Sequence, residues 1–302
     1  MTCPICEGSN LSHLQANGHY SVQAVFGVAI LECVDCRFLF ADFIHPQVID
    51  YFYKNLCRKG TDDEEFSGLR ENAAKSGRSQ LKTIKPYLPR AIGRVLDFGG
   101  GVGETARLFL PMAEEVYITE SDPHCLPYIK EEPRLIHIDG DDLLSEKYIG
   151  FFDFIIFSNV LEHMTYPIRR MQEFSRLLTE GGQLFVEVPN EDPFLRQAGT
   201  HCQQHISFFS PETFRKLVKK QGSFDIEELR TCGPKVEDMV ATGKLAHDFD
   251  AQKTSNGWVI RAILKNSKPK TDIIDTNLQI GDADEILARM SQMIFNIAHT
   301  YN

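Results

Sequence analysis

From residue 94 to residue 265, short apolar segments alternate with segments that carry apolar residues at helical spacing. Residues 152–158 (F-D-F-I-I-F-S) are almost continuously apolar, as expected for a strand that is buried on both faces of a sheet. Residues 167–178 and 210–222 repeat apolar residues every three or four positions, which predicts amphipathic helices. The predicted strands are 94–98, 116–119, 135–138, 152–158, 183–188, 225–230 and 258–265. Strands that alternate with helices predict an α/β fold, here a seven-stranded, mostly parallel sheet with helices on both faces.

The same pattern divides the chain into four parts. Residues 1–45 contain two cysteine pairs and predict a small domain of their own, whereas residues 46–90 are charged and helix-compatible and predict a helical linker or lid. The α/β domain then spans residues 91–266, and residues 267–302 predict a C-terminal helical extension. One stripe of this extension is apolar, which predicts packing onto its own domain or a homodimer through the helix. Its members are Ile286, Met290, Met293, Ile294 and Ile297.

Composition narrows the class of protein. The chain has 302 residues with 42% apolar and 25% charged residues, which is ordinary for a globular protein. No stretch approaches the roughly 18 consecutive apolar residues of a membrane span, and no signal peptide is evident at the N-terminus, so we expect a cytoplasmic protein without a membrane partner. The net charge of −10 makes nucleic acid an unlikely partner.

Four of the eight cysteines form two C-x-x-C pairs, Cys3 with Cys6 and Cys33 with Cys36. Two such knuckles can supply the tetrahedral four-sulfur shell that zinc prefers, and the alternating stretch between them is typical of a hairpin. The sequence therefore predicts a small zinc ribbon with a structural Zn²⁺ ion. Two redox-active pairs, or an iron centre with the same ligands, are the alternatives.

Residues 97–104 (D-F-G-G-G-V-G-E) follow the first predicted strand, at the edge where ligands bind in parallel sheets. Gly99 and Gly101 allow a tight turn and let a ligand lie against bare backbone. The dinucleotide pattern G-x-G-x-x-G is not met from Gly99, because its sixth position is Glu104, whereas from Gly101 the sixth position is Ala106, which a looser form of the pattern allows. Asp97 and Glu104 instead favour a ligand that carries positive charge, such as S-adenosylmethionine.

The segment D-F-G-G-G-V-G-E resembles the first motif of class I S-adenosylmethionine-dependent methyltransferases, which have a Rossmann-like fold. Four further landmarks follow in the order of that family, among them N-V-L-E-H, which that family places near the methyl group, and L-L-T-E-G-G-Q-L-F-V-E-V-P-N. The resemblance implies that an acid after the second strand accepts bonds from the ribose hydroxyls, and that an acid after the third strand approaches the adenine amino group. It thereby assigns cofactor-binding roles to Asp97, Gly99, Gly101, Glu120, Ser121, Asp141 or Asp142, and Asn159.

A further segment, H-I-S-F-F-S-P-E-T-F, resembles one in a branch of this family that has an N-terminal four-cysteine zinc domain. The best-known members of this branch are sugar C-methyltransferases. In them the first histidine of the segment is the last residue of a motif Y-x-E-H, and a further C-terminal domain follows. The positions of Y-x-E-H are here Cys202, Gln203, Gln204 and His205, so the histidine matches and the tyrosine and glutamate do not. Because the sequence ends at residue 302, we expect that the further domain is lacking. The resemblance implies His205 as the first candidate for the catalytic base and His163 as the second.

The leading hypothesis is methyl transfer from S-adenosylmethionine to a small molecule, a nucleotide-linked sugar or a natural product, by in-line displacement with a histidine base. The alternatives are a ribosomal or transfer RNA methyltransferase that uses the zinc ribbon as an RNA clamp, and an inactive binding module with a methyltransferase-like fold. A dehydrogenase is the weakest candidate.

Overall fold

A computed structural model describes residues 2–14, 25–42, 44–58, 63–198, 205–242, 252–267 and 288–293. A seven-stranded sheet, in the order β10-β11-β8-β7-β4-β5-β6, forms its centre. Strand β11 runs opposite to the other six strands, so the predicted α/β architecture with a mostly parallel sheet is confirmed. The strands are β4 (Ile92–Phe98), β5 (Ala113–Thr119), β6 (Leu135–His137), β7 (Phe152–Ser158), β8 (Leu178–Pro189), β10 (Phe224–Lys235) and β11 (Gly257–Asn266).

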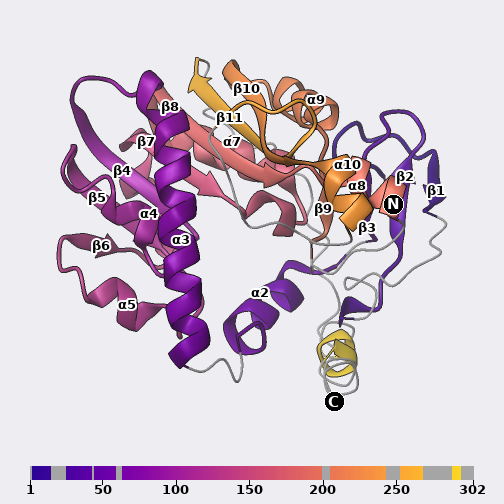
Figure 1. Ribbon diagram of the computed structural model, residues 1–302, viewed down its shortest axis with the longest axis horizontal. Helices are drawn as coiled ribbons and strands as arrows, with labels where there is room; N and C mark the ends of the chain where they lie inside the picture. Colours follow the sequence, from indigo (N-terminus) through magenta and orange to yellow (C-terminus); the bar gives the residue numbers. More distant parts are fainter. Residues whose placement is uncertain are drawn as a thin grey trace.

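Helices cover both faces of this sheet (Figure 1). On β7, Ile155 and Phe157 pack toward one apolar cluster with α7 (Pro167–Leu177) and α9 (Pro211–Gln221). Phe154 and Ile156 pack toward the other cluster, which includes the ends of the long helix α3 (Asp63–Ile84) and of α5 (Leu126–Lys130). The alternation of side chains along each strand, with both faces of the sheet covered, explains why the run 152–158 is almost continuously apolar.

The other helices are short and lie mainly in the connections between strands. They are α4 (Glu104–Arg107), α6 (Gly140–Leu143), α8 (Glu191–Ala198) and α10 (Val236–Thr242), with 3₁₀ turns η1 (Lys85–Tyr87), η2 (Glu146–Tyr148) and η3 (Leu161–His163). Residues 104–113 (E-T-A-R-L-F-L-P-M-A) have a helix-like sequence that predicts a helix of that length, and this prediction is wrong in length. After Arg107 the chain continues in tighter turns, with Phe109 N–H bonded to the carbonyl of Ala106 at 3.0 Å. Helix α9 is as predicted, with Ser210 as its N-cap and Gly222 (φ 79°) as its C-cap.

The N-terminal strands form a second sheet in the order β1-β2-β3-β9. Its members are β1 (Leu11–His13), β2 (Ile30–Cys33), β3 (Leu39–Ala41) and β9 (Ser207–Phe208). Strand β9 comes from the α/β part of the sequence and pairs with β3, so the predicted ribbon of residues 1–45 is completed by a strand more than 160 residues later. Figure 1 shows this sheet at the opposite end of the molecule from β5 and β6.

Helix α2 (Pro46–Asn55) and α3 occupy the segment that the sequence predicts as a helical linker. Val48, Ile49 and Phe52 of α2 pack into an apolar cluster with the ribbon strands. Met293 of the C-terminal extension is buried in the same cluster, whereas Ile286, Ile294 and Ile297 lie outside the described residues. Packing of Met293 onto its own chain is therefore observed, and the homodimer through this helix stays a prediction. Within the described part of the chain, none of the helices has the length and apolar character needed to cross a bilayer.

Candidate functional site

The glycine loop joins β4 to α4, and its backbone conformation is unfavourable for residues other than glycine. Gly99, Gly101 and Gly103 have φ angles of 66°, 57° and 80°, in the left-handed region where glycine is favoured. A Cβ atom on Gly99 would lie 2.9 Å from Cγ2 of Val160, whereas a Cβ atom on Gly101 would meet nothing within 4 Å. The loop is therefore packed against the end of β7 at Gly99 and open to a ligand at Gly101.

Asp97 lies beneath this loop and is 3% exposed. Burial raises its pKa to about 7, although the backbone N–H of Ala106 works in the opposite direction. Its Oδ2 atom has no hydrogen-bond partner among the described residues, and a Cβ atom on Gly100 would lie 2.9 Å from the carboxylate. The carboxylate thus supports the turn from below rather than standing on the open side of the loop.

Glu120 follows β5 and meets the glycine loop directly. Its Oε2 atom accepts the backbone N–H of Gly101 at 2.8 Å, and its Oε1 atom accepts the N–H of Asp122 at 2.7 Å. The tertiary structure therefore brings together Glu120 and Gly101, which the sequence separates by 18 residues. Ser121 is exposed in the loop that follows.

Asp141 and Asp142 are exposed on α6, after β6. The carboxylate of the preceding Asp139 caps this helix by accepting the N–H of Asp141 at 3.1 Å. Lys54 of α2 lies near this acidic segment: its pKa is raised mainly by a hydrogen bond to Asp50, with smaller contributions from Asp141 and Asp139. Helix α2 therefore extends toward the end of β6, next to the loop predicted to meet the adenine.

Asn159 directly follows β7 and has the left-handed conformation (φ 53°). Its backbone N–H donates to the carbonyl of Glu187 at 2.8 Å, and its Nδ2 atom donates to Oε1 of Glu187 at 3.1 Å. Glu187 is fully buried on β8, opposite Arg261 on β11, whose Nε donates to its Oε2 at 2.5 Å. Gln80 of α3 donates to the same carboxylate at 2.8 Å. This network fixes the position of Asn159.

The two candidate bases, His163 and His205, lie in contact with each other. Their ring centroids are 4.6 Å apart, although the sequence separates them by 42 positions. Nδ1 of His163 forms a hydrogen bond of 2.6 Å with the hydroxyl of Tyr53 on α2, and Nδ1 of His205 forms one of 2.7 Å with Oε1 of Glu191 on α8. Both rings are therefore held in orientation through Nδ1 by groups that the sequence did not single out.

Glu162 completes this cluster. It is 1% exposed, and its Oε1 atom lies 4.0 Å from Nε2 of His163. Burial, reinforced by the charges of Glu191 and Glu187, holds its pKa well above the usual range. One ligand atom each of Glu162, His163 and His205 lies within 4.8 Å of the others. We call these three residues the histidine cluster.

Sequence reasoning missed Tyr53, Glu187 and Glu191 as parts of the site. Glu187 carried a signal, because it interrupts an otherwise apolar strand, and Glu191 directly follows the V-P-N motif. Tyr53 carried none, since only the fold places α2 beside η3. The positions at which the sequence departs from Y-x-E-H, Cys202, Gln203 and Gln204, lie outside the described residues.

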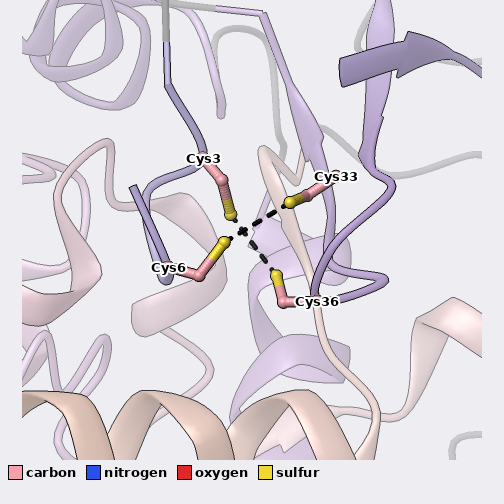
Figure 2. A group of neighbouring side chains, drawn as sticks. All are labelled: Cys3, Cys6, Cys33 and Cys36. Carbon is pink, nitrogen blue, oxygen red and sulfur yellow. Dashed lines mark hydrogen bonds between the residues drawn. The ribbon is translucent and has the colours of Figure 1, made fainter. Parts of the chain in front are cut away.

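The four N-terminal cysteines converge from the two knuckles (Figure 2). The Sγ atoms of Cys3 and Cys36 are 3.5 Å apart and those of Cys6 and Cys33 are 3.4 Å apart. Four sulfurs bound at about 2.3 Å to a tetrahedral ion would lie about 3.8 Å apart, close to these distances. The backbone N–H of Ile5 also donates to Sγ of Cys3 at 3.4 Å, and the four thiols form no disulfide. The four sulfur atoms of Cys3, Cys6, Cys33 and Cys36, which we call the cysteine cluster, fit a four-coordinate metal ion.

Comparisons with known proteins concern the family and the fold of this chain. The family model described as a methyltransferase domain matches residues 68–228, more than half of the chain. The uncharacterized protein MJ1123 of Methanocaldococcus jannaschii is 24% identical over 166 residues, which are 53% of this chain and 78% of that protein. The crystal structure of an S-adenosylmethionine-dependent methyltransferase and possible histamine N-methyltransferase from Thermotoga maritima is similar with a TM-score of 0.50 and 18% identity, over 74% of this chain and 99% of that one.

The family match covers the glycine loop, Glu120 and the histidine of N-V-L-E-H, and the structural similarity covers about three quarters of the chain. The chain therefore belongs to the methyltransferase domain family, and it has the fold of an S-adenosylmethionine-dependent methyltransferase.

Proposed function

We propose that this methyltransferase transfers the methyl group of S-adenosylmethionine to a small-molecule acceptor, in the class of nucleotide-linked sugars and natural products. The observation that carries the proposal is the arrangement at the carboxyl ends of three adjacent strands. The open glycine loop follows β4, Glu120 follows β5, and the histidine cluster begins directly after β7.

The cofactor site uses the two elements that meet at Gly101. The carboxylate of Glu120 already accepts two backbone N–H groups, which fixes its orientation, so it can accept the ribose hydroxyls without reorganisation. In this proposal Asp97 acts through the glycine loop, which it supports from below, and Asp141 or Asp142 contacts the adenine amino group. Asn159, held by Glu187, stands at the edge between the cofactor and the acceptor.

The acceptor lies on the far side of Asn159, at the histidine cluster. His205 is the base that removes the acceptor proton, and its hydrogen bond to Glu191 presents the other ring nitrogen to the acceptor and stabilises the protonated ring. His163, oriented by Tyr53, stands beside it as a second polar contact. In-line displacement then needs only alignment of the acceptor atom with the methyl group.

The N-terminal cysteines hold a structural Zn²⁺ ion in this proposal. Four sulfur ligands leave no open coordination position, so the ion stabilises the ribbon and takes no part in methyl transfer. The ribbon packs against its own α/β domain through β9, and Lys216 of α9 donates to the carbonyl of Cys36 at 3.0 Å. This packing supports a role inside the enzyme rather than as an RNA clamp.

Calorimetric titration tests the cofactor assignment. S-adenosylmethionine and S-adenosylhomocysteine should bind to the wild-type protein, NAD should not, and Glu120→Ala should weaken both nucleosides about 100-fold, because two charge-assisted contacts to the ribose are lost. Binding of NAD alone, or an unchanged affinity in Glu120→Ala, would overturn the proposal. For the base, His205→Ala with undiminished turnover would remove this residue from the mechanism.

A further inference from the structure

Asp122 is a buried carboxylate that follows the proposed ribose ligand Glu120 by two positions. Its residue is 3% exposed. Although burial raises the pKa of Asp122, hydrogen bonds from the backbone N–H of His124 and from the Arg58 guanidinium hold this pKa below the usual range, so the carboxylate is charged. A buried charge needs a partner of opposite charge, because removal of that partner is strongly destabilising.

Arg58 supplies the partner of Asp122. Its Nη1 atom donates to Oδ2 of Asp122 at 2.6 Å and to Sγ of Cys125 at 3.2 Å. The other oxygen, Oδ1, accepts the backbone N–H of His124 at 2.9 Å and forms a hydrogen bond of 2.8 Å with Nδ1 of the same residue. Among the described residues, Arg58 is therefore the only arginine or lysine in contact with this carboxylate.

The backbone of Asp122 in turn holds the carboxylate of Glu120. The N–H of Asp122 donates to Oε1 of Glu120 at 2.7 Å, while the N–H of Gly101 donates to Oε2 at 2.8 Å. The two carboxylates share one environment: the pKa of the Cys125 thiol is raised to about 12, mainly by burial, and the charges of Glu120 and Asp122 both add to this increase. A shift of Asp122 toward water would therefore withdraw one of the two N–H groups that orient Glu120.

The second partner of Arg58 lies next to the glycine loop. Cys125 is fully buried and packs in a small apolar cluster with Val102 of that loop and Phe66 of α3. Arg58 thus contacts both the segment that follows Glu120 and a residue packed against the glycine loop. Both contacts are with the α/β domain, although Arg58 itself comes shortly after helix α2 in the sequence.

We propose that Arg58 is a positioning residue of the cofactor site: it neutralises Asp122 and so keeps the Glu120 carboxylate in the orientation that accepts the ribose hydroxyls. This inference rests on the proposed function and adds a residue to its cofactor site. Without Arg58, the segment that carries Asp122 moves toward water to hydrate the buried charge, and Glu120 loses the N–H of Asp122. Because Nη1 alone makes both contacts, the positive charge of Arg58 is needed rather than the fork of its guanidinium.

Calorimetric titration of the full chain with S-adenosylhomocysteine tests this role. Arg58→Met keeps a long side chain without its charge, and should weaken binding about tenfold. Arg58→Lys keeps the positive charge, and should bind within about threefold of the wild type. Arg134→Met is the matched control and should leave the affinity unchanged, since Arg134 forms an exposed ion pair with Glu132 directly before β6.

A double variant separates positioning from direct contact with the cofactor. In Arg58→Met combined with Asp122→Asn, the buried charge is absent and the amide oxygen can still accept the N–H of His124. If Arg58 acts by neutralising Asp122, the affinity for S-adenosylhomocysteine should return to within about threefold of the wild type.

The outcomes separate the alternatives. Unchanged affinity in Arg58→Met, or an equal loss in Arg58→Met and Arg58→Lys, would overturn the inference. A double variant that binds as weakly as Arg58→Met would also overturn it, because Arg58 would then contact the cofactor directly. If Arg58→Met does not fold, Arg58→Lys and the double variant decide by the same criteria. Absence of S-adenosylhomocysteine binding in the wild type would instead refute the proposed function, so the two failures are distinguishable.

Discussion

Disruption of the cysteine cluster should reach the histidine cluster through strand β9. Cys36→Ser removes one of the four sulfurs, and a structural zinc site contributes about 10–16 kcal/mol to the folding of a small zinc module. A three-stranded ribbon of this size has little apolar core of its own, so we expect β1, β2 and β3 to lose their structure without the ion. Because β9 pairs with β3, through Leu39 with Phe208 and Phe40 with Ser207, it loses its only strand neighbour among the described residues.

The loss of structure in the ribbon should extend to Ile206, the residue next to the proposed base His205. Ile206, directly after His205, accepts the N–H of Ala41 at 2.8 Å and donates its own N–H to the carbonyl of Glu162 at 2.9 Å. A displacement of a catalytic group by about 1 Å costs about 100-fold in rate, so kcat should fall about 100-fold. Glu120 and the glycine loop make no hydrogen bond to the ribbon among the described residues. The Kd for S-adenosylhomocysteine should therefore change by no more than about twofold.

The assay combines three measurements on the same preparation: metal content, calorimetric titration with S-adenosylhomocysteine, and release of S-adenosylhomocysteine from S-adenosylmethionine in the presence of an acceptor. Cys57→Ser is the control, since Cys57 is an exposed thiol outside the cluster. A Cys36→Ser protein that lacks the ion and retains wild-type kcat would refute the coupling. A parallel loss of cofactor affinity would show that the variant unfolds generally, and would refute the claim that the ribbon acts on the histidine cluster alone.

Three further predictions follow from individual contacts. Tyr53→Phe removes the 2.6 Å hydrogen bond to His163 and should lower kcat about tenfold at an unchanged Kd for the cofactor, in stopped assays and calorimetry; an unchanged kcat would contradict the orienting role. The pKa of Asp97 is raised to about 7, so the folded apoprotein binds more protons than the unfolded chain above the ordinary aspartate pKa. Its free energy of unfolding in urea should therefore fall as the pH rises toward 7 relative to Asp97→Asn, and parallel pH curves would contradict the burial effect. Arg261→Met leaves Glu187 charged and buried and should cost about 3–5 kcal/mol of unfolding free energy, which a second change, Glu187→Gln, should largely restore; no recovery in the double variant would assign the loss to packing.

Glu187 and Arg261 illustrate what the sequence could predict about the site and what it could not. Each charge interrupts an apolar strand, at V-E-V and at V-I-R-A, and the sequence alone marks both as anomalies without relating them. The structure places the two residues opposite each other on β8 and β11, where they neutralise each other and hold Asn159. Pairing of these strands depends on a crossover of about 70 residues, and local patterns carry no information on such long-range contacts.

The sequence by itself determined the α/β class, the strands and most helices, the glycine loop and the two cysteine knuckles. These features depend on residues a few positions apart, where periodicity, turn chemistry and ligand spacing act directly. The tertiary structure decided that β9 completes the ribbon, that His163 and His205 touch, and that Tyr53 and Glu191 orient them. Those contacts join residues between 14 and 169 positions apart, and burial of the shared core, rather than any local preference, brings them together.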